Sequence, residues 1–158
     1  MIRQSCALNA GENVLIESIG APNQIITALI HETNVVGANP FVSIKDEQII
    51  RELSFCYTEK YVKMMADIEL YTLKKMDAFI GIRGFTNINE LSDVPEVNKK
   101  NVLKHYVKPV HLKQRNENTK SVLLRWPTAS MAQTAGMSTD AFENMYFNAC
   151  LLDYLKLG

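Results

Sequence analysis

The sequence lacks the patterns that mark membrane, exported and disulfide-rich proteins. No apolar run approaches the roughly 20 residues that span a bilayer. The first 18 residues contain one arginine and no long apolar segment, so we expect no signal peptide. The three cysteines, Cys6, Cys56 and Cys150, are widely separated and show no C-x-x-C or metal-ligand spacing. We therefore expect a cytoplasmic protein whose cysteines are buried, reduced thiols.

An excess of charge of one sign is lacking as well. The 158 residues include 17 Lys+Arg and 17 Asp+Glu, so the formal net charge is zero. Proteins that bind nucleic acid usually have surplus lysine and arginine, and we expect neither a nucleic-acid nor a membrane partner here. A chain of this length can bury a core of its own, which predicts one domain over residues 1–158.

Four short apolar runs, rich in β-branched or aromatic residues, are typical of buried strands. They cover Val14–Ile19, Phe41–Ile44, Ala78–Gly84 and Ser121–Pro127. The segments between them have helical periodicity. Because strands that alternate with helices connect as right-handed β-α-β units, the order predicts an α/β fold. We expect a three-layer sandwich with a mostly parallel four-stranded sheet, Rossmann/flavodoxin-like, and helices on both faces.

Three details of the helical segments can be tested. The stretch from Glu47 to Met76 predicts two helices that are broken near Tyr57. A further helix is expected to begin near Pro95, and Pro109 should kink or end it because proline donates no backbone hydrogen bond. Ser138 is a good N-cap for a last helix, which we expect to reach Leu157.

The motifs of common catalytic and cofactor sites are missing. The first strand is followed by ESIGAPNQ, whose single glycine fits neither the dinucleotide nor the phosphate-loop pattern. His31 and Glu32 begin like H-E-x-x-H, but the fifth residue is Val35. Neither G-x-S-x-G nor a Cys-His signature appears. The sequence therefore predicts no catalytic residue and no metal ligand in this chain.

Arg83 and Arg125 are the candidate binding residues, because each lies at or near the carboxyl end of an apolar strand. Ligands of open α/β sheets bind beyond these ends. A charge there needs a partner or water. Three roles remain open: an ion pair with a carboxylate such as Glu17 or Asp46, recognition of a carboxylate or phosphate by the bidentate guanidinium, or an interdomain contact.

The segment RWPTASMAQTAGMSTDAFENMYFNACLLDY, residues 125–154, resembles the metal-dependent aminopeptidases of the thermophilic type. These comprise leucyl aminopeptidase, aminopeptidase T and aminopeptidase S. Upstream, NAGENVLIES and DAFIGIRGFTN are similar to the opening strand of that family and to its apolar strand with an Arg-Gly loop.

This resemblance implies a larger enzyme that removes N-terminal residues from peptides. Two divalent metal ions, zinc, cobalt or similar, would be bound by a C-terminal catalytic domain that these residues do not contain. The present chain would then be the N-terminal, non-catalytic domain, which forms part of the active-site cavity or a dimer, and would be inactive alone. The alternative is a stand-alone α/β module that binds a small ligand or a protein.

The last predicted helix, Phe142–Leu157, is apolar around nearly all of its circumference. An apolar surface of this kind usually marks a contact with another domain or subunit. We therefore expect Tyr146, Phe147, Leu151 and Tyr154 to contact the missing catalytic domain or a second copy in a homodimer.

Overall fold

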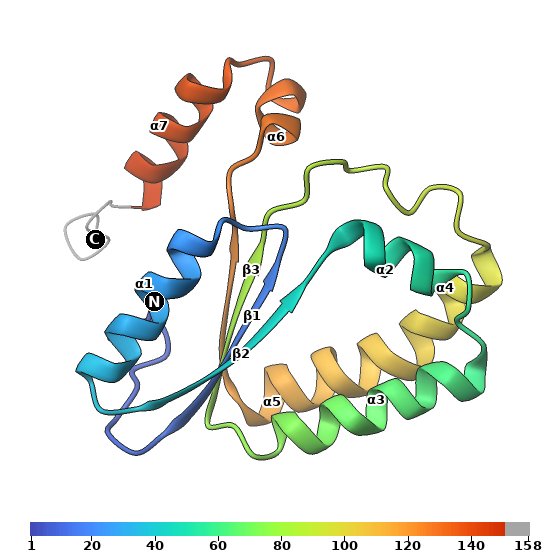
Figure 1. Ribbon diagram of the computed structural model, residues 1–158, viewed down its shortest axis with the longest axis horizontal. Helices are drawn as coiled ribbons and strands as arrows, with labels where there is room; N and C mark the ends of the chain where they lie inside the picture. The colour runs from blue at the N-terminus through green and yellow to red at the C-terminus, as the bar shows by residue number, and fades with distance from the viewer. Residues whose placement is uncertain (151–158) are drawn as a thin grey trace.

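The computed structural model describes residues 1–150, and at its centre is a four-stranded parallel sheet in the order β2-β1-β3-β4 (Figure 1). The predicted α/β fold, with its parallel sheet, is confirmed. Each predicted strand is present, and its ends differ from the predicted ones by at most two residues. The strands are β1 (Asn13–Ile19), β2 (Asn39–Lys45), β3 (Ala78–Arg83) and β4 (Lys120–Arg125).

Helices cover both faces of the sheet, as predicted (Figure 1). Helix α1 (Asn23–Val35) packs on one face, where Ile16 and Ile80 contribute to a fully buried apolar core. Helix α3 (Glu59–Leu73) and the helix η1 (Leu103–Arg115) cover the other face and bury Leu15 and Phe79. Because successive side chains of a strand point to opposite faces, alternate residues of the same strands serve the two cores.

The predicted break near Tyr57 is confirmed, and hydrogen bonds to side chains fix the helices around it. Helix α2 (Glu47–Ser54) begins after Asp46, whose carboxylate accepts from the backbone N–H groups of Gln48 and Ile49. Helix α3 begins after Thr58, whose hydroxyl accepts from the N–H of Tyr61 at 3.3 Å. Such caps satisfy backbone donors that have no partner within the helix.

Of the two expectations for Pro109, that it kinks or that it ends its helix, the second is wrong. Helix α4 (Glu96–Val102) continues directly into η1, which is a π-helix and includes Pro109 in its interior, and a short α5 (Asn116–Asn118) follows. A proline ring collides with the carbonyl four residues earlier in an α-helix. The π-helix bonds residue i to residue i+5, so its wider turn leaves room for the ring.

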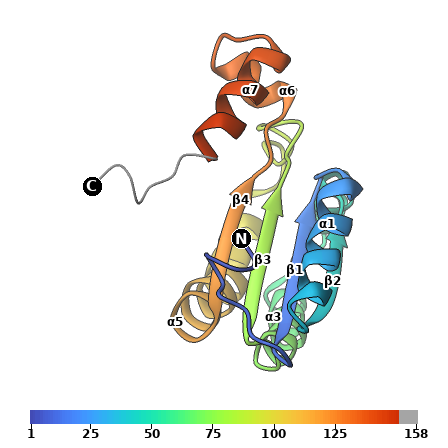
Figure 2. The ribbon, with the colours of Figure 1, turned by 90° about the vertical axis from the view of Figure 1, so that its left-hand side faces the viewer.

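After β4 the chain leaves the sheet and forms α6 (Ala129–Thr134) and α7 (Thr139–Cys150), which project beyond the strand ends (Figure 2). The hydroxyl of Ser138 accepts from the N–H of Ala141 at 3.3 Å, which confirms it as an N-cap. The predicted continuation of this helix toward Leu157 lies outside the described residues.

The expectation of three buried thiols is correct only in part. Cys6 is buried, whereas Cys56, in the turn after α2, and Cys150 are exposed; all three are free. Within residues 1–150, no helix combines the length and the apolar character needed to cross a bilayer.

Candidate functional site

In open α/β sheets ligands usually bind where the strand order reverses, but between β1 and β3 this position is closed by backbone contact. The N–H of Gly84 donates to the carbonyl of Ile19 at 2.8 Å. Gly20 has a φ of +66°, and a Cβ added there would lie 2.6 Å from the carbonyl oxygen of Gly84. Glycine is therefore required at this close approach. The cavity lies instead beside the strand ends, on the face covered by α3 and η1.

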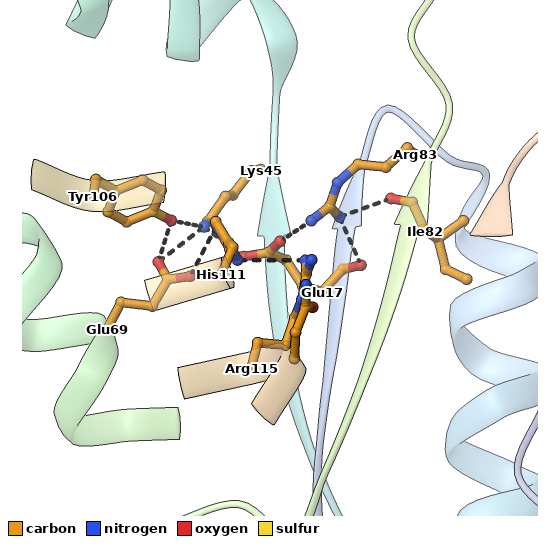
Figure 3. Close-up of polar contacts among 9 residues, drawn as sticks. Glu17, Lys45, Glu69, Ile82, Arg83, Tyr106, His111 and Arg115 are labelled. Atoms are coloured by element: carbon orange, nitrogen blue, oxygen red, sulfur yellow. Dashed lines mark hydrogen bonds and ion pairs between the residues drawn. The ribbon is translucent and has the colours of Figure 1, made fainter. Parts of the chain in front are cut away.

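This cavity has a volume of about 760 Å³ and two contrasting parts. Most of its walls are apolar and come from the strand ends and from α2, α4 and η1, with Ile44, Ile50, Leu53, Val102 and Leu103 as examples. The remaining part is a charged cluster drawn from five elements (Figure 3). We define this cluster as Glu17, Lys45, Glu69, Arg83, Tyr106, His111 and Arg115.

Glu17 on β1 is the centre of the cluster and is only 2% exposed. Its carboxylate accepts from Lys45 Nζ at 2.5 Å and from the guanidinium of Arg83. Burial alone would raise the pKa of Glu17, but the positive charges of Lys45 and Arg83 outweigh burial and hold the pKa below its ordinary value. Glu17 is therefore an ionised, doubly paired carboxylate inside the protein.

Glu69 on α3 forms the second half of the cluster. Its Oε2 accepts from Tyr106 OH at 2.6 Å and from Lys45 Nζ at 3.2 Å, so Lys45 bridges the two carboxylates. Burial would lower the pKa of Lys45, but Glu17 and Glu69 together raise it. Burial and the charge of Glu69 raise the pKa of Tyr106. Lys45 is therefore charged and Tyr106 is a neutral donor.

His111 and Arg115 on η1 complete the cluster. Burial lowers the pKa of His111 more than Glu69 raises it, so the ring is neutral at pH 7. Arg115 Nη1 lies 3.4 Å from His111 Nδ1. A guanidinium can only donate, so Nδ1 is the acceptor and the ring proton is on Nε2. Nε2 lies 3.9 Å from Glu69 Oε1, too far for a direct hydrogen bond.

Arg115 differs from the other two cations of the cluster. Lys45 and Arg83 each pair with a carboxylate, whereas no carboxylate oxygen of residues 1–150 lies within 4 Å of the Arg115 guanidinium. Its Nε donates to Asn116 Oδ1 at 3.2 Å, and the guanidinium lies over the ring of Phe79, 5.4 Å from the centroid. Burial lowers the pKa of Arg115, and the nearby charge of Arg83 adds to this effect.

The two arginines predicted as binding residues have different surroundings. Arg83 pairs with Glu17, which confirms the ion-pair alternative for this residue. Arg125 is exposed at the end of β4 and lines a smaller cavity of about 400 Å³ together with Arg83 and Glu47. Whether either arginine binds a ligand stays a prediction.

The predicted interface residues lie on α7 or beyond it. Tyr146 OH donates to the backbone carbonyl of Arg125, and the Phe147 ring packs edge-on against Trp126 with centroids 5.3 Å apart. Both side chains therefore contact the end of the domain itself. Leu151 and Tyr154 lie outside the described residues, and the interface stays a prediction.

The sequence predicted Arg83 and its possible partner Glu17 at the strand ends, but not the residues that helices contribute to the cluster. Tyr106, His111 and Arg115 are five and four residues apart, a spacing that the i-to-i+5 bonding of a π-helix brings toward one face. In an α-helix, His111 and Arg115 would share a face, but Tyr106 would lie on a different one. A proline inside an otherwise helical pattern, Pro109, was the available signal.

Within residues 1–150, no group of three or more His, Cys, Asp or Glu side chains is placed to hold a metal ion. The arrangement instead holds fixed charges beside an apolar space. Glu17 and Glu69 each pair with Lys45, Glu17 also pairs with Arg83, and Oε1 of Glu69 is buried without a hydrogen-bond partner among the described residues. Arg115 is the cation of the cluster that pairs with neither carboxylate.

Comparison with solved structures identifies a protein that shares this fold. No family model and no curated protein matches the chain. A solved structure of wild-type AmpT from Thermus thermophilus superimposes with a TM-score of 0.61 and 16% sequence identity over 79% of this chain. The match spans 33% of the AmpT chain. At this identity the likeness shows a shared fold.

Proposed function

We propose that this chain is a non-catalytic α/β domain of a metal-dependent aminopeptidase, as the sequence resemblance implies. The observation that carries the proposal is the fold shared with AmpT, an aminopeptidase, over most of this chain and a third of the other. The class of hydrolase comes from the sequence resemblance, and the shared fold supports it.

In this role the domain contributes structure rather than chemistry. The described residues hold a buried, internally paired charged cluster and no grouped metal ligands. Helices α6 and α7 project from the sheet, and Met145 on α7 is half exposed. This projecting pair is a suitable contact surface for a catalytic domain or for a second copy of the chain.

The first test is a peptidase assay on the purified 158-residue chain. We expect no release of p-nitroaniline from leucine p-nitroanilide with added zinc or cobalt, because residues 1–150 hold no group of metal ligands. A parallel purification from cells with the empty vector controls for host peptidases. Metal-dependent activity that co-purifies with the chain would overturn the assignment as a non-catalytic domain.

The second test uses the gene. We expect the reading frame that includes these residues to encode a further domain with spaced Glu, His and Asp residues. The product of that whole frame should cleave leucine p-nitroanilide, and removal of divalent ions with a chelator should abolish the cleavage. A complete gene product without metal-dependent aminopeptidase activity would contradict the proposal.

A further inference from the structure

Arg115 is a buried cation whose charge the described protein does not neutralise. The residue is 8% exposed, it lines the 760 Å³ cavity, and its polar contacts are Asn116 Oδ1 and the neutral ring of His111. Burying a charge without an opposite charge is unfavourable, so such groups usually have a partner. At this site the partner is missing from residues 1–150.

The charge balance of the cluster favours a ligand with one negative charge. Lys45, Arg83 and Arg115 are positive, whereas Glu17 and Glu69 are the negative groups. Both carboxylates already bond to Lys45, and Glu17 also pairs with Arg83. One additional anion beside Arg115 would leave the cluster neutral.

The walls of the cavity determine what the rest of the ligand must be. Away from the cluster, most of the lining consists of aliphatic side chains from α2, α4 and η1 and from the strand ends. Polar groups placed against such walls would lose water without gaining hydrogen bonds. The volume lies within the range of ordinary small-molecule sites. A nucleotide or a sugar phosphate does not fit this lining, whereas an apolar chain does.

We infer that this cavity binds a monocarboxylic acid with an apolar chain, with the carboxylate on the Arg115 guanidinium and the chain along the aliphatic walls. A planar guanidinium with free N–H groups suits a carboxylate because it can form two parallel hydrogen bonds. This inference does not depend on the proposed aminopeptidase role, since the site lies entirely within the described residues.

The test is titration calorimetry of the 158-residue chain with octanoate and with two probes that keep its chain but change its head group, octan-1-ol and octylammonium. Octanoate should bind about tenfold or more tightly than octan-1-ol, because only the acid gains charge-assisted hydrogen bonds. Octylammonium should bind more weakly still. Shortening the acid toward butanoate should weaken binding by about fourfold per methylene.

Two substitutions locate the carboxylate. Arg115→Met should reduce octanoate affinity to about that of octan-1-ol and leave octan-1-ol binding unchanged. Arg3→Met is the matched control, because Arg3 is an exposed arginine outside this cavity that pairs with Glu32, and it should change neither affinity. Arg115→Lys keeps the charge without the planar fork and should bind with intermediate affinity. Circular dichroism verifies the fold of each variant.

The inference is overturned if octanoate and octan-1-ol bind wild-type protein equally well, or if octanoate fails to bind up to its solubility. It is also overturned if folded Arg115→Met or Arg115→Lys binds octanoate as tightly as wild type. The head-group comparison uses wild-type protein alone, so it decides the question even if Arg115→Met does not fold.

Discussion

The two faces of the sheet are built from the same strands but have opposite characters. On the α1 face, Ile16 and Ile80 are fully buried in a continuous apolar core. On the α3 and η1 face, the neighbouring residue Glu17 and the nearby Arg83 form a buried ion pair at the edge of a cavity. The alternation of a strand thus supplies a continuous apolar core on one side, and on the other a smaller apolar core beside a charged site.

The contrast matters because the two faces stabilise the protein differently. Apolar burial contributes about 25 cal/mol per Å² of surface removed from water. Buried charges lose their hydration, and their mutual attraction often does little more than compensate for that loss. We therefore assign most of the stability to the α1 face, and we regard the charged cluster as a feature retained for binding.

Removal of Glu17 should have the largest effect. Glu17→Gln leaves Arg83 without a carboxylate and leaves Lys45 with Glu69 alone, so we expect a loss of about 3–5 kcal/mol in the free energy of unfolding. Urea denaturation measures this loss in the free energy of unfolding. Glu59→Gln is the control, because the exposed Glu59–Lys63 pair should contribute little to stability. Equal losses in the two variants would show that the buried ion pairs of Glu17 stabilise the protein no more than an exposed pair does.

A pair of truncations compares the faces directly. Ile16→Ala on the α1 face, where the side chain is 0% exposed, should reduce stability by about 2–5 kcal/mol because it leaves a cavity in a packed core. Leu123→Ala on the opposite face, where the side chain is 51% exposed at the cavity, should cost less than about 1 kcal/mol. Similar losses would contradict the assignment of stability to the α1 face.

The pH dependence of stability tests the state of Glu17. Its folded-state pKa lies below 4.5, so its contribution is present above pH 4.5 and is lost as the pH falls through the folded-state pKa. Lys45→Met removes one of the two cations that lower this pKa, and burial then raises it. The midpoint of acid unfolding should therefore move to higher pH than in wild type.

Lys63→Met is the matched control for that measurement, since Lys63 pairs with the exposed Glu59 at the start of α3. Its acid midpoint should stay close to that of wild type. An unchanged midpoint in Lys45→Met would mean that Lys45 does not hold Glu17 in its ionised form.

The strands and most helices were predictable because their signals are local. Val14–Ile19 and Ala78–Gly84 are short apolar runs bounded by turn residues, and Tyr57 and Ser138 lie at helix boundaries that side-chain caps define. The pair between Arg83 and Glu17 was one of the alternatives, because parallel strands bring their carboxyl ends to one edge.

The rest of the site was not predictable, because it depends on a helix type that the sequence pattern does not specify. Arg115 reaches the cluster only because η1 continues through Pro109 in the π form. Glu69 is one of many acidic residues on helices, and only the packing of α3 against β2 brings it to Lys45. These contacts are long-range, and no local periodicity encodes them.

The central claim is that Arg115 is held as an unpaired cation for a ligand rather than for stability. Urea denaturation of Arg115→Met against wild type, without added ligand, tests it most directly. Because the substitution removes an uncompensated buried charge and keeps an apolar stem, we predict a free energy of unfolding within about 0.5 kcal/mol of wild type, or higher. A loss of about 2 kcal/mol or more would show that Arg115 is a structural residue and would contradict the account.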